Sequence, residues 1–173
     1  MTFTASNRAR AEEIVARYPR PKSAILPLAH LAQDQDGWLT DEAMAEIAEL
    51  TGVTAADVLG TCSFYTMFKR RPAGKLVVSV CTNVTCLVTG GPEILEHLEA
   101  RFATDADVTV EEVECIAACD LAPVIQVNYE FHGPLTPDRA DALVDEYRRG
   151  ARTPRTLSGS PAVDRGVVQG SAS

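Results

Sequence analysis

The chain has 173 residues, with 24 acidic against 16 basic side chains and a formal net charge of -8. Its content of 46% hydrophobic and 23% charged residues is typical of a folded protein rather than a disordered one. The acidic balance argues against a nucleic-acid partner, because phosphate contacts need clustered Lys and Arg. No apolar run approaches the roughly 20 residues that span a bilayer. Residues 1–10 show no secretory signal, so we expect a cytoplasmic protein with reduced thiols.

The first part of the chain predicts a bundle of short helices, which we assign to a helical domain over residues 1–72. Each predicted helix has a polar residue that can cap its start, and a Pro or Gly can end each of the first three. The fourth predicted helix begins with a capping box. The predicted caps are Ser6 or Asn7, Ser23, Thr40 and Thr54, and the terminators are Pro19, Gly37 and Gly52. Between them the apolar residues recur at helical spacing.

From residue 73 the apolar pattern changes to that of strands, which predicts a second domain over residues 73–150. The predicted elements are strands at 75–80, 108–113 and 124–127, a turn into a fourth strand at 128–133, and helices after Gly90-Gly91-Pro92 and after Thr136-Pro137. This order is that of a small thioredoxin-like α/β sandwich. The predicted fold class is therefore α+β, a helical bundle followed by that sandwich, and residues 151–173 are expected to be a disordered tail.

Charge is unevenly distributed along the chain. Residues 1–149 carry a net charge of -10, whereas the remainder carries +2. Residues 93–120 hold nine acidic side chains and one Arg, a net of -8. Composition alone favours a solvated acidic face, and the alternative is that these acids set the electrostatics of a site.

Four of the five cysteines form two pairs, each directly after a predicted strand. Cys81 and Cys86 form C-x4-C, and Cys115 and Cys119 form C-x3-C. Neighbouring strands would bring the two loops to one edge of the sheet, where four thiolates make a soft-ligand metal site. Cys62 stands alone beside aromatic residues, and we expect it to be a buried apolar residue rather than a ligand.

Several kinds of site use cysteine pairs, and the spacings discriminate among them. Structural disulfides are disfavoured without a secretory signal, and a thioredoxin-type dithiol needs C-x-x-C. A structural zinc site usually has tighter C-x2-C loops. A [2Fe–2S] cluster held by four thiolates, one cysteine pair per iron, fits best. The alternative to an electron-transfer protein stays open: a non-redox protein in which the four cysteines bind zinc and organise an interaction surface.

Two segments resemble the E subunits of bacterial NADH:quinone oxidoreductase (respiratory complex I). These subunits form a family of thioredoxin-like [2Fe–2S] ferredoxins. The two segments are Cys81-Thr-Asn-Val-Thr-Cys86 and Glu114-Cys-Ile-Ala-Ala-Cys-Asp-Leu-Ala-Pro-Val-Ile-Gln-Val-Asn128, preceded by the similar segments 33–39 and 64–68. The resemblance covers about residues 10–149. One departure is Ala117, where the family more often has Gly. The same module occurs in NAD-dependent formate dehydrogenases and hydrogenase diaphorases, so those contexts stay open.

The resemblance implies an iron–sulfur electron-transfer subunit that exchanges one electron with the flavin of a partner subunit. The four paired cysteines, Cys81, Cys86, Cys115 and Cys119, would be the cluster ligands. FMN and NADH are expected in the partner, further iron–sulfur subunits are expected as other partners, and the chain would lie peripheral to the inner face of the cell membrane. It is then an enzyme only as a subunit of the NADH dehydrogenase, with no catalytic residue of its own.

Three hypotheses concern the reduction potential and the backbone geometry of this site. The acidic stretch 93–120 is expected to disfavour reduction and lower the potential, because local charge is one determinant of it. Backbone N–H groups and the hydroxyls of Thr82 and Thr85 are expected to act in the opposite direction by hydrogen-bonding the sulfurs. Pro123 precedes a strand at a point where thioredoxin-like folds commonly have a cis proline, and we expect a cis bond there.

The remaining residues of interest are expected to have structural roles. Phe64 and Phe68 are expected in the core of the helical domain, and Trp38 is the better candidate for contact with a partner protein. The three histidines, His30, His97 and His132, are expected on the surface or in helix packing rather than as ligands.

Overall fold

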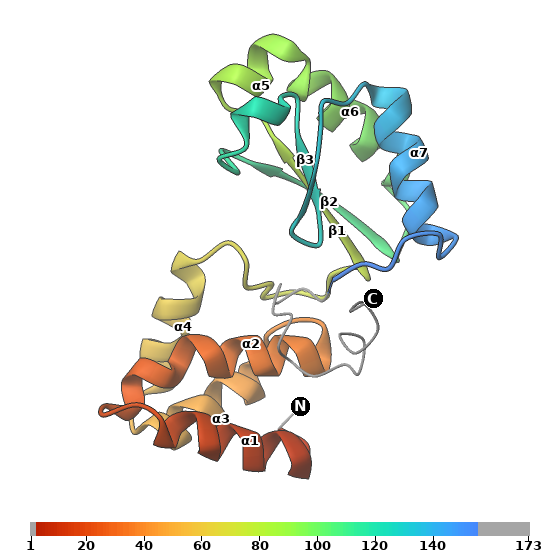
Figure 1. Ribbon diagram of the computed structural model, residues 1–173. Helices are drawn as coiled ribbons and strands as arrows, with labels where there is room; N and C mark the ends of the chain where they lie inside the picture. Colours follow the sequence, from red (N-terminus) through yellow and green to blue (C-terminus); the bar gives the residue numbers. More distant parts are fainter. Residues whose placement is uncertain (1–2, 156–173) are drawn as a thin grey trace, which may run out of the picture. The chain divides into compact units, whose positions relative to one another are not determined.

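A computed structural model of the chain describes residues 3–155, which fall into two compact units, 3–72 and 73–155 (Figure 1). Each unit has a hydrophobic core of its own. Most of the expected tail, residues 156–173, lies outside the described residues. Among the described helices, none combines the length and the apolar character that crossing a membrane requires.

The first unit is a bundle of four α-helices. They are α1 (Ala5–Ala16), α2 (Ile25–Asp36), α3 (Asp41–Thr51) and α4 (Ala55–Phe64), with the short 3-10 helix η1 (Pro21–Ala24) before α2. Thr40 and Thr54 cap α3 and α4 as predicted, and Thr54 forms a reciprocal capping box with Asp57. Helix α1 begins earlier than expected, because the side chain of Thr4 accepts a hydrogen bond from the Asn7 N–H.

The core of the helical unit contains Phe68 as predicted, but not Phe64. Phe68 is 4% exposed, whereas Phe64 is 79% exposed, with its ring centroid 5.1 Å from that of Tyr65. The buried residues of α4 are Val58 and Cys62, four apart on one helix face. Phe64 follows Cys62 by two positions and therefore points to the other side of α4, so its predicted core position is wrong.

The second unit is a four-stranded mixed sheet with α-helices packed on one face (Figure 1). Its elements are β1 (Leu76–Cys81), α5 (Val84–Thr89), α6 (Gly91–Phe102), β2 (Val108–Val113), the 3-10 helix η2 (Cys119–Leu121), β3 (Ile125–Val127), β4 (Glu130–His132) and α7 (Pro137–Arg148). The strand order is β2-β1-β3-β4, and only β1 and β2 are parallel. Alternate residues of β1 pack with α6 and α7 in the core, namely Leu76, Val78 and Val80.

The parallel pairing of β1 and β2 determines where the cysteine loops lie. The register places Cys81, the last residue of β1, opposite Val113, the last residue of β2. The chain therefore leaves both strands at the same edge of the sheet, as expected. The short helix α5 inside the first cysteine loop was not predicted, because six residues are too few to show a helical period. The peptide bond before Pro123 is cis, as expected, and so is the bond before Pro134.

Candidate metal centre

The four paired cysteines line one small cavity at the carboxyl ends of β1 and β2. Its volume is about 30 Å³. The lining consists of Cys81, Asn83, Thr85, Cys86, Cys115, Ala117, Ala118, Cys119 and Val124. The lining contains no carboxylate and no imidazole, so the side chains that can supply charged donor atoms are the four cysteines. Thiolate donors are those that iron–sulfur clusters and zinc prefer.

Different elements hold the two cysteine pairs. Cys81 ends β1 and Cys86 lies in α5, and both side chains are almost completely buried. The backbone N–H of Cys81 donates to the carbonyl oxygen of Val124 at 3.2 Å, which ties the end of β1 to the segment before β3. Cys115 and Cys119 lie on the loop after β2 and are exposed. The site therefore has a buried pair on β1 and α5, and an exposed pair in the segment after β2, where Cys119 begins η2.

The surroundings of Cys86 oppose the ionisation of its thiol. Burial raises the pKa of the Cys86 thiol, and the neighbouring Cys81 and Cys119 raise it further, because adjacent thiolates repel each other. A hydrogen bond with the backbone of Val124 acts in the opposite direction. A cationic iron group bound among the sulfurs would remove this repulsion, so the donor set fits a metal group of positive charge.

Backbone groups contact two of the four sulfurs. The N–H of Ala117 donates to Sγ of Cys115 at 3.3 Å, and the thiol of Cys81 donates to the carbonyl oxygen of Glu114 at 3.8 Å. The expected role of Thr82 is wrong in this structure, since its hydroxyl donates to the Glu112 carboxylate at 2.7 Å. That carboxylate attracts the proton of the hydroxyl more strongly than a sulfur does. Thr85 lines the cavity, and the predicted hydrogen bond from its hydroxyl to a sulfur stays a prediction.

The four cysteines come to this cavity as two pairs along the sequence, Cys81 with Cys86 and Cys115 with Cys119. Within residues 3–155, no three His, Cys, Asp or Glu side chains are grouped so as to hold a single metal ion. A two-iron cluster needs two thiolates for each iron, and its four ligands surround the whole cluster. The chain supplies two thiolates from each of two loops, which agrees with that requirement.

Ala117 has a backbone conformation that suits glycine. Its φ is 56°, in the left-handed region, where a Cβ costs roughly 1–2 kcal/mol. This is the position where the resembled family more often has Gly. We expect Ala117→Gly to raise the free energy of unfolding by about 0.5–1 kcal/mol, the relief of strain exceeding the entropy that Gly gains in the unfolded chain. Anaerobic urea titration of the metal-loaded protein, followed by circular dichroism, measures this.

The neighbouring Ala118 provides the control for this prediction. Its φ is -122° and its side chain is 9% exposed, so Gly relieves no strain there and removes a buried methyl group. Ala118→Gly should therefore lower the free energy of unfolding by roughly 1 kcal/mol. Equal losses in both variants would show that Ala117 is not strained.

Cys62 is a buried residue, as predicted. It lies in the core of the helical unit with no exposed surface, and burial raises the pKa of its thiol to about 11. A thiol with that pKa stays protonated near neutral pH, and the thiolate is the form that binds metal.

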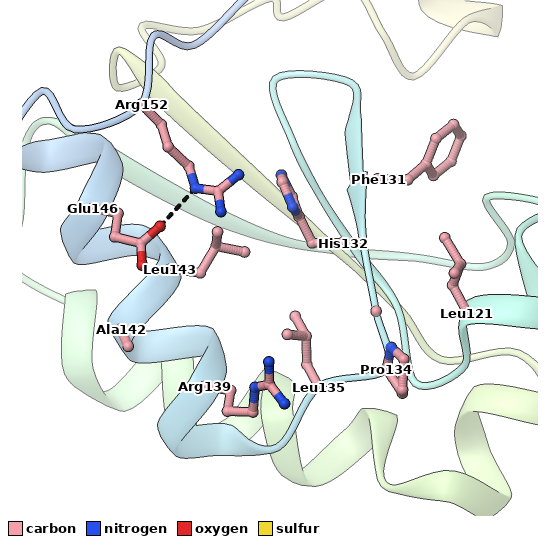
Figure 2. A pocket seen from close by; sticks show the side chains of 11 residues that line it. Leu121, Phe131, His132, Pro134, Leu135, Arg139, Ala142, Leu143, Glu146 and Arg152 are labelled. Carbon is pink, nitrogen blue, oxygen red and sulfur yellow. Dashed lines mark hydrogen bonds and ion pairs between the residues drawn. The ribbon is translucent and has the colours of Figure 1, made fainter.

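A larger cavity of about 410 Å³ lies elsewhere in the second unit, between the β4–α7 connection and α7 (Figure 2). Its walls include His132, Leu135, Leu143 and an ion pair between Arg152 and Glu146, whose atoms are 2.6 Å apart. None of the four paired cysteines lines it. His132 Nε2 lies 3.0 Å from the Tyr147 hydroxyl, so this histidine packs against α7, as expected for a structural residue.

The remaining histidines also contact neighbours in their own units. His30 packs its ring 4.8 Å from that of Phe68, and His97 lies 2.9 Å from the Asp141 carboxylate. The cysteine cavity has no histidine in its lining, so the structural roles predicted for these side chains agree with where they lie.

His132 should make the stability of the fold sensitive to acid. Burial lowers the pKa of His132 from its usual 6.5, with Arg152 lowering it and Glu130 and Glu146 raising it to lesser extents. Because the unfolded chain then binds the proton more tightly, this contribution to stability is present above about pH 6.5 and is lost as the pH falls below that value. We expect His132→Gln to flatten the decline in unfolding free energy between about pH 7.5 and pH 5.5. Urea titrations at several pH values measure the slope, and an unchanged slope would contradict the assignment.

Comparison with known proteins identifies the class to which this fold and site belong. Residues 11–148 match the thioredoxin-like [2Fe-2S] ferredoxin family, and the chain belongs to that family. It is 42% identical to the E subunit of the NADH-quinone oxidoreductase of Mycobacterium tuberculosis (strain ATCC 25618 / H37Rv), over 87% of this chain and 68% of the relative. It is 36% identical to the E 2 subunit of the NADH-quinone oxidoreductase of Rhizobium meliloti (strain 1021), over 84% of this chain and 90% of that protein. The family resemblance seen in the sequence is thus confirmed.

A solved structure shares the fold over most of the chain. It is the crystal structure of an NAD+-reducing [NiFe]-hydrogenase in the H2-reduced state, with a TM-score of 0.63 and 25% identity. The match covers 72% of this chain but only 22% of the hydrogenase chain, so the shared region is a small part of that longer protein.

Proposed function

We propose that this chain is the iron–sulfur electron-transfer subunit of an NADH-quinone oxidoreductase, with one [2Fe–2S] cluster bound by Cys81, Cys86, Cys115 and Cys119. The observation that supports this most strongly is the cavity lined by all four thiols at the joint carboxyl ends of β1 and β2. Relatives at 36% and 42% identity, both named as E subunits of that complex, support the assignment to this enzyme. The hydrogenase shares the fold at lower identity, which does not favour that alternative.

The residues of the site would bind a redox group rather than transform a substrate. A bound [2Fe–2S] cluster supplies storage of a single electron. Cys81 and Cys86, which are buried on β1 and α5, and Cys115 and Cys119, which are exposed, would hold the cluster. The N–H of Ala117 stabilises negative charge on the Cys115 sulfur. All four sulfurs are used as ligands, which leaves no position for substrate.

The partner completes the reaction in this proposal. NADH and FMN would bind to another subunit, this chain would hold the group that exchanges one electron with the flavin, and further iron–sulfur subunits would belong to the same assembly. The chain then lies at the inner face of the cell membrane as a peripheral part of that complex.

The direct test is spectroscopy of the chain purified without oxygen. We expect a coloured protein with two irons and two sulfides, and a low-temperature EPR signal that appears after reduction by dithionite. A colourless protein that contains one zinc would overturn the proposal and support the non-redox interaction module.

Three acidic residues near the cysteines should lower the reduction potential. Glu111 accepts a hydrogen bond from the Ser79 hydroxyl at 2.6 Å, Glu112 accepts one from Thr82, and Glu114 precedes Cys115. Reduction adds negative charge beside them, so replacing all three by Gln should raise the potential, by roughly tens of millivolts in about 0.1 M salt. Redox titration of the cluster measures the shift.

Asp107 provides the control for this effect. It precedes β2, so the six residues of that strand separate it from the cysteine edge by about 20 Å. Asp107→Asn removes a charge of the same sign and should leave the potential unchanged, because salt screens over that distance. A potential that stays the same in the triple Gln variant would show that the acidic stretch is only a solvated surface.

A further inference from the structure

The cavity between the β4–α7 connection and α7 has walls that the fold holds in place. The N–H of Leu135 donates to the carbonyl oxygen of Pro123 at 3.1 Å. A Cβ at Gly133 would overlap the carbonyl oxygen of Leu121, so the β4–α7 connection packs directly against η2. On the other side, Leu143 of α7 belongs to the core of the second unit. The cavity is therefore largely pre-formed, and its volume of about 410 Å³ is in the range of small-molecule sites.

The lining of this cavity combines an aliphatic surface with positive charge. Its charged side chains are Arg139, Glu146 and Arg152. The aliphatic lining residues are Leu121, Pro134, Leu135, Ala142 and Leu143. In the view of Figure 2, Leu143 and Leu135 lie between the guanidinium groups of the two arginines. A ligand that fits this arrangement has an apolar body and at least one anionic group.

The two arginines differ in how their charge is compensated. Glu146 contacts Nε of Arg152 at 2.6 Å and neutralises it. The backbone N–H of Arg139 donates to Thr136, but within residues 3–155 the guanidinium of Arg139 has no hydrogen-bond or ion-pair partner. None of the residues three and four positions away from Arg139 is acidic, so no neighbour on the helix face supplies a carboxylate. In the described part of the chain this positive charge is thus unpaired, although the whole chain carries a net charge of -8.

We infer that this cavity binds a small organic anion with an aliphatic body, with the anionic group at Arg139 and the body on Leu135 and Leu143. A guanidinium pairs with a carboxylate or a phosphate group through two parallel hydrogen bonds. Burial of the aliphatic body against the leucines supplies the apolar part of the affinity. A neutral ligand is a poorer occupant because it leaves the guanidinium unpaired, and a cationic ligand is repelled by it. None of the four paired cysteines lines the cavity, so the inference does not depend on the proposed function.

Calorimetric titration of the chain, purified without oxygen and with its cluster, tests the binding. The probes are hexanoate and octanoate as carboxylates, octyl phosphate as the phosphate, and octanol and octylamine as a neutral and a cationic ligand with the same aliphatic chain. We expect octanoate to bind about tenfold more tightly than hexanoate, because each buried CH₂ group raises the affinity by about threefold to fourfold. Octanol and octylamine should bind at least about tenfold more weakly than the tighter of the two octyl anions. Comparison of octanoate with octyl phosphate identifies the anionic group.

Substitutions in the lining locate the binding. Arg139→Gln should weaken binding of the tighter octyl anion at least about tenfold, and Arg139→Lys should retain part of the affinity. Ala142 is exposed, so Ala142→Phe should fill part of the cavity and weaken binding without disturbing the core. Arg149→Gln is the matched control, because it also removes one positive charge but does not change the lining, and it should bind like the wild type. Circular dichroism reports on the fold of each variant.

The outcomes separate this inference from the proposed function. If the wild-type chain bound neither octyl anion, or if Arg139→Gln bound as tightly as the wild type, the inference would be wrong. Equal losses in Arg139→Gln and Arg149→Gln would also overturn it, since binding would then follow only the net charge. A normal [2Fe–2S] EPR signal without anion binding would leave the proposed function standing. Binding that depends on Arg139 in a chain without that signal would leave this inference standing.

Discussion

Cys119→Ala is expected to remove the cluster while leaving the fold of the chain intact. The side chain of Cys119 is exposed and packs against little, so its loss removes a ligand without opening a cavity in the core. With three thiolates left, one iron lacks a protein ligand, and the visible absorption and the EPR signal should be lost or reduced to a small fraction. Iron and sulfide analysis and EPR measure the loss, and circular dichroism reports on the fold.

Cys62→Ala is the matched control for the loss of a ligand. It also removes one sulfur, but from the core of the helical unit, and it should retain the full iron content. Because the site is fully buried, we expect it to lower the free energy of unfolding by about 1 kcal/mol. If Cys62→Ala lost the cluster and Cys119→Ala kept it, the ligand assignment would be wrong. Cys86→Ala should resemble Cys119→Ala in iron content, with an added loss of stability because Cys86 is buried.

The features that the sequence predicted correctly are those with a local chemical cause. Thr40, Thr54 and Thr136 cap helices because a short hydroxyl side chain can accept a backbone N–H, and this preference is visible in the chain itself. The parallel pairing of β1 and β2 follows from a strand, a helical crossover and a second strand in sequence. That topology brings both cysteine loops to one edge of the sheet, which is why the site could be anticipated.

The features that the sequence missed depend on neighbours that are distant along the chain. Thr82 was expected to contact sulfur, but the register of β2 places Glu112 within its reach. The left-handed φ of Ala117 is a property of the folded loop, and only the family comparison with Gly gave a signal for it. The exposure of Phe64 depends on which face of α4 packs on the bundle. In each case the local sequence was compatible with two outcomes, and tertiary packing decided between them.

Gly91→Ala should destabilise the second unit and loosen the cysteine site at the same time. A Cβ at this position would lie 2.6 Å from the carbonyl oxygen of Cys81, 2.9 Å from that of Cys86 and 3.1 Å from the Cys86 Cβ. Two of these neighbours are backbone atoms, which cannot rotate away, so β1 or α5 must move. We expect the free energy of unfolding to fall by about 2–4 kcal/mol and the cluster to be lost faster in air.

Gly60 and Gly91 distinguish two explanations for a glycine in a helix. Gly60 lies in α4 with nothing within 4 Å of the point where an added methyl group would lie, so Gly60→Ala should be neutral or raise the free energy of unfolding by up to about 1 kcal/mol. If Gly91 served only to begin α6, Gly91→Ala would behave similarly, because Ala is the better helix former. If Gly91 instead packs closely on Cys81 and Cys86, Gly91→Ala lowers the free energy of unfolding, and Gly91→Val lowers it further. Urea titration and the rate of cluster loss in the three variants therefore decide whether Gly91 is a helix start or the contact surface on which Cys81 and Cys86 are positioned.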